Sequence, residues 1–174
     1  MADLFTVGHS NYPIADFISL LGQFEIEVLV DVRSNPYARY ATHFTGPFLK
    51  QSIVQAGLKY LYLGKELGGM PKEPEFYDDE GNLNYAKLAA TSKFQEGMER
   101  LVRGVQTYQV AIMCAEEDPS HCHRHRLISK AAKEMGVVVK HIRKGARVQS
   151  DDELIAEYTP DTPEVTQLNL FGLN

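Results

Sequence analysis

Reactive side chains are concentrated in one short stretch of the chain, residues 112–125. The stretch contains both cysteines, three of the six histidines and three acidic residues. An apolar segment at 110–113 precedes it with the character of a buried strand, and helical spacing of apolar residues follows it. Reactive groups between a strand and a helix are a common arrangement in active sites. The stretch therefore indicates a site with thiol, imidazole or carboxylate chemistry.

Cys114 is the first candidate, because it ends the predicted strand and faces the predicted helix. A thiol in such a position can have a lowered pKa and act as a nucleophile. Segment 28–33 also resembles the opening of rhodanese domains, and cysteine-dependent phosphatases place a cysteine after a strand and an arginine in the next helix. However, Arg124 lies further along the chain from Cys114 than in phosphatase loops, and the acids at 116–118 would repel a phosphate. A small buried residue that merely ends a strand is the alternative.

A metal site is a second interpretation of the stretch, because Cys and His are ligands that zinc prefers. The candidate ligands are Cys114, His121, Cys122, His123 and His125. Three of them are consecutive and would point in different directions on one helical turn. His121 and His125 are four residues apart but lack a motif such as His-Glu-x-x-His, and the sequence has no Cys-x-x-Cys pair. We therefore assign no metal and no cofactor from the sequence.

The elements that must position these residues alternate along the chain. Strands are expected at 4–7, 27–32, 58–63, 109–114 and 137–142, and helices at 13–21, 47–55, within 85–105 and at 122–134. This order predicts a single α/β domain with a mostly parallel five-stranded sheet and helices on both faces. We expect the domain to span residues 1–150. A short helix, a linker and a tail motif are expected at 151–174.

Polar residues follow each predicted strand. In an open α/β sheet, ligands bind outside the carboxyl ends of the strands, so these groups are predicted to share one pocket. Those after the first three strands are His9 and Ser10, then Asp31 and Arg33, then Gly68 and Gly69. Those after the last two are Cys114 and Glu116, then His141 and Arg143.

Roles within this pocket follow from side-chain chemistry. Catalytic roles are predicted for Glu116, His9, Cys114 and Asp31, because carboxylates and imidazoles tuned by burial act as general acids and bases. The alternative role of the Glu116 and Asp31 carboxylates is to pair with Arg33 or Arg124 and so fix a loop. Substrate-binding roles are predicted for Ser10, Arg33, Gly68, Gly69, His123 and Arg124.

Four separated motifs resemble, in order, the family called Domain of Unknown Function 488. They are Thr6-Val7-Gly8-His9-Ser10, Asp31-Val32-Arg33-Ser34-Asn35-Pro36, Leu67-Gly68-Gly69, and Met113-Cys114-Ala115-Glu116 with Cys122-His123-Arg124. The resemblance covers roughly residues 3–145. It implies a compact α/β domain and a shared polar pocket built from these motifs, and it brings no established reaction.

The loop at 33–44 mixes basic and aromatic side chains. Tyr37, Arg39, Tyr40, His43 and Phe44 lie within it. Arginine and aromatic faces together can hold single-stranded nucleic acid or a flipped base. Packing of these aromatic rings on the edge of the sheet is the alternative.

The carboxyl-terminal segment carries a second motif. Gln167, Leu168, Leu170 and Phe171 resemble the bacterial peptide that binds the DNA sliding clamp, although Asn169 departs from the pattern at its third position. Two apolar anchors would enter a groove, and the preceding linker with Pro160 and Pro163 would give the peptide reach. Docking of this tail on its own domain, or on a second copy, is the alternative.

Composition narrows the class of protein. The 174 residues are 44% hydrophobic and 24% charged, which is ordinary for a globular domain. The formal net charge of −5 argues against a protein that coats nucleic acid through a broad basic surface. No membrane span or signal peptide is expected, and two cysteines without a secretory signal favour a cytoplasmic protein with reduced thiols.

Together these features predict an enzyme directed at nucleic acid or nucleotides, of hydrolase type, recruited to DNA by the clamp-binding tail. Two other classes remain open. One is a rhodanese-like or phosphatase-like enzyme that uses Cys114. The other is a non-catalytic module that binds an anion or a nucleotide. The sequence does not decide the oligomeric state.

Overall fold

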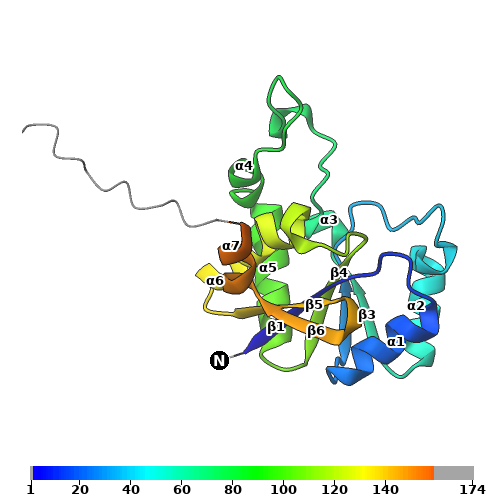
Figure 1. The fold of residues 1–174 in the computed structure, drawn as a ribbon. Coiled ribbons are helices and arrows are strands. Elements are labelled where there is room, and N and C mark those ends of the chain that lie inside the picture. The colour runs from blue at the N-terminus through cyan, green and yellow to red at the C-terminus, as the bar shows by residue number, and fades with distance from the viewer. Residues whose placement is uncertain (1, 159–174) are drawn as a thin grey trace, which may run out of the picture.

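The computed structural model describes residues 2–158. Within this range the chain folds as a layered α/β domain (Figure 1), as the sequence predicts. The clamp-binding motif predicted at Gln167, Leu168, Leu170 and Phe171 lies outside the described residues. No helix in the described range is both long and apolar enough to cross a membrane.

One sheet has the strand order β3-β2-β4-β1-β5-β6. Five strands run parallel to their neighbours: β1 (Asp3–Gly8), β2 (Val28–Asp31), β3 (Lys59–Tyr62), β4 (Val110–Cys114) and β5 (Val138–Arg143). A sixth strand, β6 (Arg147–Ser150), runs antiparallel to β5 at the edge. The expected five-stranded count was therefore too low by one. The reason is that β6 is a short edge strand whose first two residues, Arg147 and Val148, are exposed, so it lacks an apolar pattern.

Helices cover both faces of the sheet. On one face lie α1 (Ile14–Gln23) and α2 (Gly46–Gln55); on the other lie α3 (Gly64–Leu67), α4 (Tyr85–Ala89), α5 (Ser92–Val105) and α6 (Lys130–Glu134). The last described helix, α7 (Asp151–Tyr158), buries Leu154 completely. Short 3₁₀ turns occupy η1 (Thr42–Phe44), η2 (Pro74–Phe76), η3 (Pro119–His121) and η5 (Lys144–Ala146).

The helix predicted at 122–134 begins later and is less regular than expected. Cys122 is extended, His123 is the first helical residue, and a π-helical segment, η4 (Arg124–Ser129), leads into α6. π-Helical turns are frequent at functional sites. Cys122 therefore lies outside the helix, and its side chain points in a different direction from the one that a regular helix starting at residue 122 would give it.

Alternation along the strands decides which helices each side chain meets. In β4, Ile112 packs in the cluster with α5 and α6, whereas Met113 packs in the cluster with α1 and α2. Because side chains alternate between the two faces, Cys114 lies on the side of Ile112, under η4. By the same rule Asp31, which follows Val30 in β2, lies on the side of α1 and α2.

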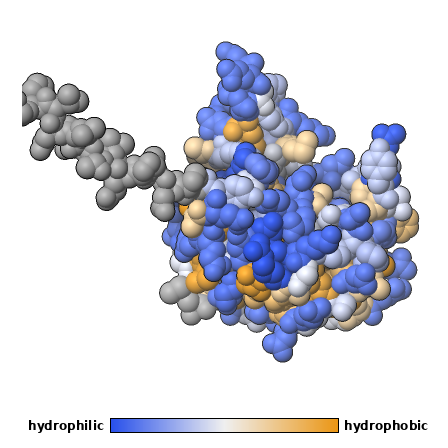
Figure 2. Space-filling model, in the orientation of Figure 1, coloured by the Kyte–Doolittle hydropathy of each residue, from blue (hydrophilic) through white to orange (hydrophobic). Residues whose placement is uncertain are grey.

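The connections create a switch point between β1 and β4. These strands are neighbours in the sheet, but the chain leaves β1 toward α1 on one face and leaves β4 toward η4 and α6 on the other. Diverging connections of this kind open a crevice at the carboxyl ends of the strands. On the face visible in Figure 2, hydrophilic surface predominates and apolar areas are small and scattered.

Candidate functional site

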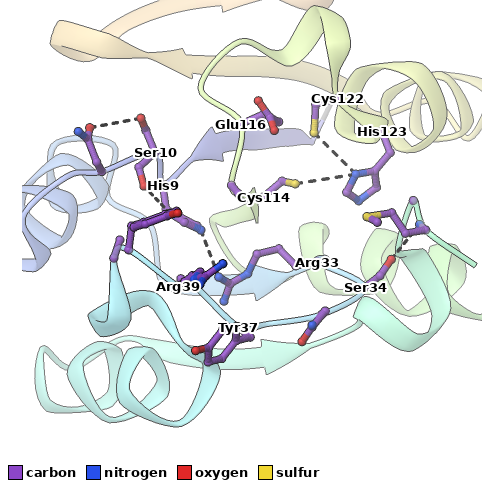
Figure 3. A pocket seen from close by; sticks show the side chains of 18 of the residues that line it. His9, Ser10, Arg33, Ser34, Tyr37, Arg39, Cys114, Glu116, Cys122 and His123 are labelled. Atoms are coloured by element: carbon purple, nitrogen blue, oxygen red, sulfur yellow. Dashed lines mark hydrogen bonds between the residues drawn. The ribbon is translucent and has the colours of Figure 1, made fainter.

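A pocket of about 740 Å³ lies at the carboxyl ends of β1, β2 and β4. Seven residues predicted for the site line it: His9, Ser10, Arg33, Gly69, Cys114, Glu116 and His123. The loop residues Tyr37, Arg39, Tyr40 and His43 also line it (Figure 3). Asp31, Gly68 and Arg124 do not belong to its lining. The switch point of the sheet is therefore where most of the predicted residues meet.

Asp31 holds Arg33 in place. The Arg33 guanidinium donates from Nη2 to Asp31 Oδ2 at 2.6 Å and from Nε to Oδ1 at 2.9 Å, and the Arg33 backbone N–H adds a bond of 3.1 Å. Tyr60 donates its hydroxyl to Oδ2 at 2.8 Å. Burial and the Asp31 carboxylate raise the pKa of Tyr60, so the phenol remains a donor. The fully buried Asp31 thus positions a cation at the pocket wall.

His9 is held as a neutral imidazole. Its Nε2 lies 3.1 Å from Arg33 Nη1, and since a guanidinium only donates, this nitrogen accepts. Nδ1 therefore carries the proton and donates to the Ser10 carbonyl at 2.8 Å. Burial lowers the pKa of His9 to about 4, and the ring stacks on Phe44 with centroids 4.3 Å apart. In this state the basic nitrogen of His9 is already bonded to Arg33.

Glu116 differs from the two acids that follow it. Glu117 accepts from Arg143 and from the Lys144 backbone, and Asp118 caps η3 through the Ser120 backbone N–H at 2.9 Å. The Glu116 carboxylate is exposed, lines the pocket and forms no hydrogen bond or ion pair with another described side chain. It is therefore the acid of the three that is available to a ligand.

Two thiols and one imidazole form a cluster on the pocket wall (Figure 3). The ligand atoms of Cys114, Cys122 and His123 all lie within 4.8 Å of one another. His123 Nδ1 is 3.9 Å from Cys114 Sγ and 3.7 Å from Cys122 Sγ. His123 Nε2 donates to the Val32 carbonyl at 3.0 Å, which leaves Nδ1 with a free lone pair toward the sulfurs.

The two thiols differ in acidity. A hydrogen bond from the Cys114 thiol lowers the pKa of Cys122 to about 3 against the opposing effect of burial, and the charge of Arg124 lowers it further. The same hydrogen bond, together with burial, raises the pKa of Cys114. Cys122 is therefore the more acidic thiol of the pair.

Arg124 supports this cluster from behind the pocket wall. Its guanidinium is fully buried and donates from Nε to Cys122 Sγ at 3.4 Å and from Nη1 to Thr6 Oγ1 at 3.0 Å. Nη2 donates to the backbone carbonyls of Glu116 and Glu117. Arg124, predicted to bind substrate, therefore contacts the loop after β4 and the Cys122 sulfur.

Close approach explains the two predicted glycines. A Cβ on Gly69 would lie 2.5 Å from Cβ and Cγ of His123, so the glycine leaves room for the imidazole. A Cβ on Gly68 would lie 2.3 Å from Ser34 Oγ. Both glycines therefore shape the site by letting neighbouring groups come close.

Sequence reasoning missed Cys122 as a site residue, and it left out Ser34, Asn35 and Met70, which also line the pocket. In the sequence, the indication for Cys122 is its position next to His123. Its partner is Cys114 at the end of β4, and only the folded structure brings the two thiols together. His121 and His125, considered together as metal ligands, have different partners. His121 contacts Arg126 on the surface, and His125 donates to Asp151 at 2.6 Å.

A second cluster lies outside the pocket and joins α7 to the sheet. Asp151 Oδ1 accepts from His125 Nδ1 and, at 3.1 Å, from His141 Nε2, and Lys133 lies 3.1 Å from Oδ2. Although burial acts in the opposite direction, these donors hold the pKa of Asp151 well below its usual range. Burial lowers the pKa of His141, and the neutral ring donates from Nε2 to Asp151, so its Nδ1 accepts from the Thr6 hydroxyl at 2.8 Å.

Comparison with known proteins identifies one family. The model described as Domain of unknown function DUF488 matches residues 13–131, which is more than half of the chain, so the protein belongs to this family. No curated protein and no solved structure matches significantly.

Proposed function

We propose that this DUF488 protein binds a nucleotide or single-stranded nucleic acid in the switch-point pocket and hydrolyses a glycosidic or phosphoester bond. The observation that carries the proposal is the lining of the pocket by arginine, aromatic rings and one unengaged carboxylate. Tyr37 and Tyr40 are 63% and 94% exposed, and Arg39 lies 5.8 Å from the Tyr40 ring centroid. Exposed aromatic rings beside arginine are suited to stacking on bases.

Arg33 supports binding of the anionic part of the ligand. A guanidinium has five N–H donors, and three are used by Asp31 and His9. The remaining donors on Nη1 and Nη2 are available at the pocket wall, where Asp31 keeps the group oriented. Such a preorganised donor pair can stabilise charge that develops on a phosphate or leaving group.

Glu116 is the proposed general base. Its carboxylate would accept a proton from the attacking water, while Arg33 stabilises the anionic centre. Substitution Glu116→Gln should lower kcat by at least about a hundredfold with little change in binding. Glu99→Gln, on the exposed side of α5, is the matched control. Unchanged turnover in the Glu116 variant would show that Glu116 is not the general base.

Binding is tested first, with fluorescent nucleotides and short oligonucleotides in an anisotropy assay. Tyr37→Ala combined with Arg39→Gln should weaken binding by about tenfold or more, since one stacked base contributes about 1–3 kcal/mol. Arg103 is an exposed residue of α5, and Arg103→Gln should leave binding unchanged. Equal affinity of all three proteins would contradict a nucleic-acid pocket.

The proposal includes recruitment to a bacterial sliding clamp, and thereby a cytoplasmic role in DNA repair. Its support is the sequence Gln167-Leu168-Asn169-Leu170-Phe171 alone. Anisotropy of the labelled protein against purified clamp should show micromolar binding that Leu170→Ala with Phe171→Ala abolishes. No binding by the unmodified protein would limit the proposal to the pocket.

A thiol enzyme is a second candidate, favoured by the lowered pKa of Cys122. The nucleophile would then be Cys122, since the pKa of Cys114, the residue first suggested by the sequence, is raised. Loss of turnover in Cys122→Ser with retention in Glu116→Gln would support this candidate. Ligand binding without turnover on any substrate would instead support a non-catalytic module.

A further inference from the structure

The cluster on the pocket wall has the composition of a metal site. Two thiolates and one imidazole are ligands that proteins use to bind zinc and similar divalent transition-metal ions, whereas magnesium and calcium prefer oxygen ligands. We propose that Cys114, Cys122 and His123 bind one zinc-class divalent ion whose fourth coordination position opens into the pocket. The metal site is inferred from geometry alone. Only a role of the metal ion in hydrolysis would rest on the proposed function.

Two of the three distances between the ligand atoms are close to those that a bound ion requires. Zinc bonds of about 2.3 Å to sulfur and about 2.1 Å to nitrogen, in tetrahedral geometry, place sulfur and nitrogen about 3.6 Å apart. The observed separations from His123 Nδ1 are 3.7 Å to Cys122 Sγ and 3.9 Å to Cys114 Sγ. The two sulfurs lie within 4.8 Å of each other. Shifts of a few tenths of an ångström would therefore bring both nitrogen–sulfur distances to those of a bound ion.

The tautomer of His123 is already that of a metal ligand. Its Nε2–H donates to the Val32 carbonyl, so the Nδ1 lone pair is directed at the two sulfurs. Metal-bound histidines usually donate their other ring N–H to a carbonyl or carboxylate in this way. Gly69 leaves room for the ring at this position, since a Cβ there would lie 2.5 Å from His123 Cγ.

Charge around the cluster is also suitable. Arg124 donates to Cys122 Sγ from behind, so part of the negative charge of two thiolates is already compensated in the buried wall. The sequence argument against a metal treated residues 121–123 as one helical turn, whereas Cys122 is extended and its partner comes from β4.

The open position distinguishes this cluster from a closed structural site. All three residues line the pocket, and no fourth Cys, His, Asp or Glu completes the group in the described part of the chain. Sites of three protein ligands with a free position bind water or substrate and lower the pKa of that water. Glu116 lines the same pocket as the three proposed ligands (Figure 3).

The second group of potential ligands offers an internal contrast. His125, His141 and Asp151 also lie within 4.8 Å of one another. There, however, both nitrogens of His141 are hydrogen-bonded, and the Lys133 ammonium lies at Asp151. The Asp151 carboxylate is therefore already paired with a cation, so this group serves as a control.

The test is a titration of the reduced, metal-free full-length protein with Co²⁺ and with Zn²⁺ against a chromophoric chelator. We expect one ion per chain and a thiolate-to-cobalt charge-transfer band, which appears only if cysteine sulfur is a ligand. Cys114→Ser, Cys122→Ser and His123→Ala should each weaken binding by at least about tenfold. His125→Gln should bind as the unmodified protein does.

Three results would overturn the site. They are no stoichiometric binding by the unmodified protein, cobalt binding without the charge-transfer band, and equal binding by the ligand variants. The band is read on the unmodified protein, so the test does not depend on folding of the variants. Because no nucleotide is present, failure here leaves the nucleotide-binding assay untouched, and failure of that assay leaves the metal site standing.

Discussion

His123 donates its Nε2–H to the backbone carbonyl of Val32 at 3.0 Å, across 91 positions of the chain. The bond joins the segment after β4 to the end of β2 and fixes which nitrogen of His123 faces the two thiols. The cluster on the pocket wall therefore depends on contacts between the ends of different strands.

Gly69→Ala should destabilise the protein by about 1–3 kcal/mol, because the added Cβ would lie 2.5 Å from the His123 side chain in a packed region. Gly104→Ala is the control. It lies in α5 with nothing within 4 Å of the added Cβ, so it should be neutral or stabilising by about 0.5–1 kcal/mol. Urea unfolding measures both. Equal effects of the two substitutions would contradict the close approach of Gly69 to His123.

His9 should make stability fall in mild acid. Burial lowers its pKa from 6.5 to about 4, so below pH 6.5 the unfolded chain takes up a proton that the folded protein does not. Stability is then lost progressively as the pH falls from about 6.5 to 4, by about 3.5 kcal/mol in total at about 1.4 kcal/mol per unit.

Urea unfolding of the unmodified protein and of His9→Gln between pH 7 and pH 4 measures this contribution. The variant lacks the titrating group, so its free energy of unfolding should fall less steeply over the same range. Parallel curves for the two proteins would show that His9 does not carry the effect.

Asp151→Asn should cost about 3 kcal/mol or more in stability, because the buried carboxylate accepts from His125, His141 and Lys133. Its neighbour gives a matched control. Asp152 also pairs with Lys133, but its side chain is 83% exposed, so Asp152→Asn should cost less than about 1 kcal/mol. Thermal unfolding compares the two, and similar melting temperatures would argue against an anchoring role for Asp151.

Asp31→Asn should weaken binding of an anionic ligand by about tenfold, since the neutral amide cannot accept from both Nε and Nη2 of Arg33 as the carboxylate does. Tyr60→Phe removes only one hydrogen bond to Asp31 and leaves the ion pair, so its effect should be smaller. Nucleotide anisotropy measures both variants. A larger loss in Tyr60→Phe would show that the ion pair does not position the arginine.

Much of the fold follows from local sequence pattern. The apolar runs at β1, β2 and β4 are long enough to predict buried parallel strands, and their order with intervening helices predicts an α/β sheet. Local pattern is weaker at β6, where Arg147 and Val148 are exposed at the edge. It also misplaces the helix after Cys122, because helical spacing does not distinguish a π-helical start from a regular one.

Residue types and their spacing along the chain are enough to predict which reactive residues follow which strands, and hence that His9, Arg33, Cys114 and Glu116 share one edge of the sheet. The chemical states of these residues depend on the tertiary fold. Asp31 and Arg124 are buried partners of their neighbours, burial lowers the pKa of His9 so that it is neutral, and the pKa of Cys122 is lowered beside Cys114. The physical reason is that protonation, tautomer and metal-ligand geometry depend on distances between segments far apart in the chain. Residue types and local periodicity carry no information about those distances.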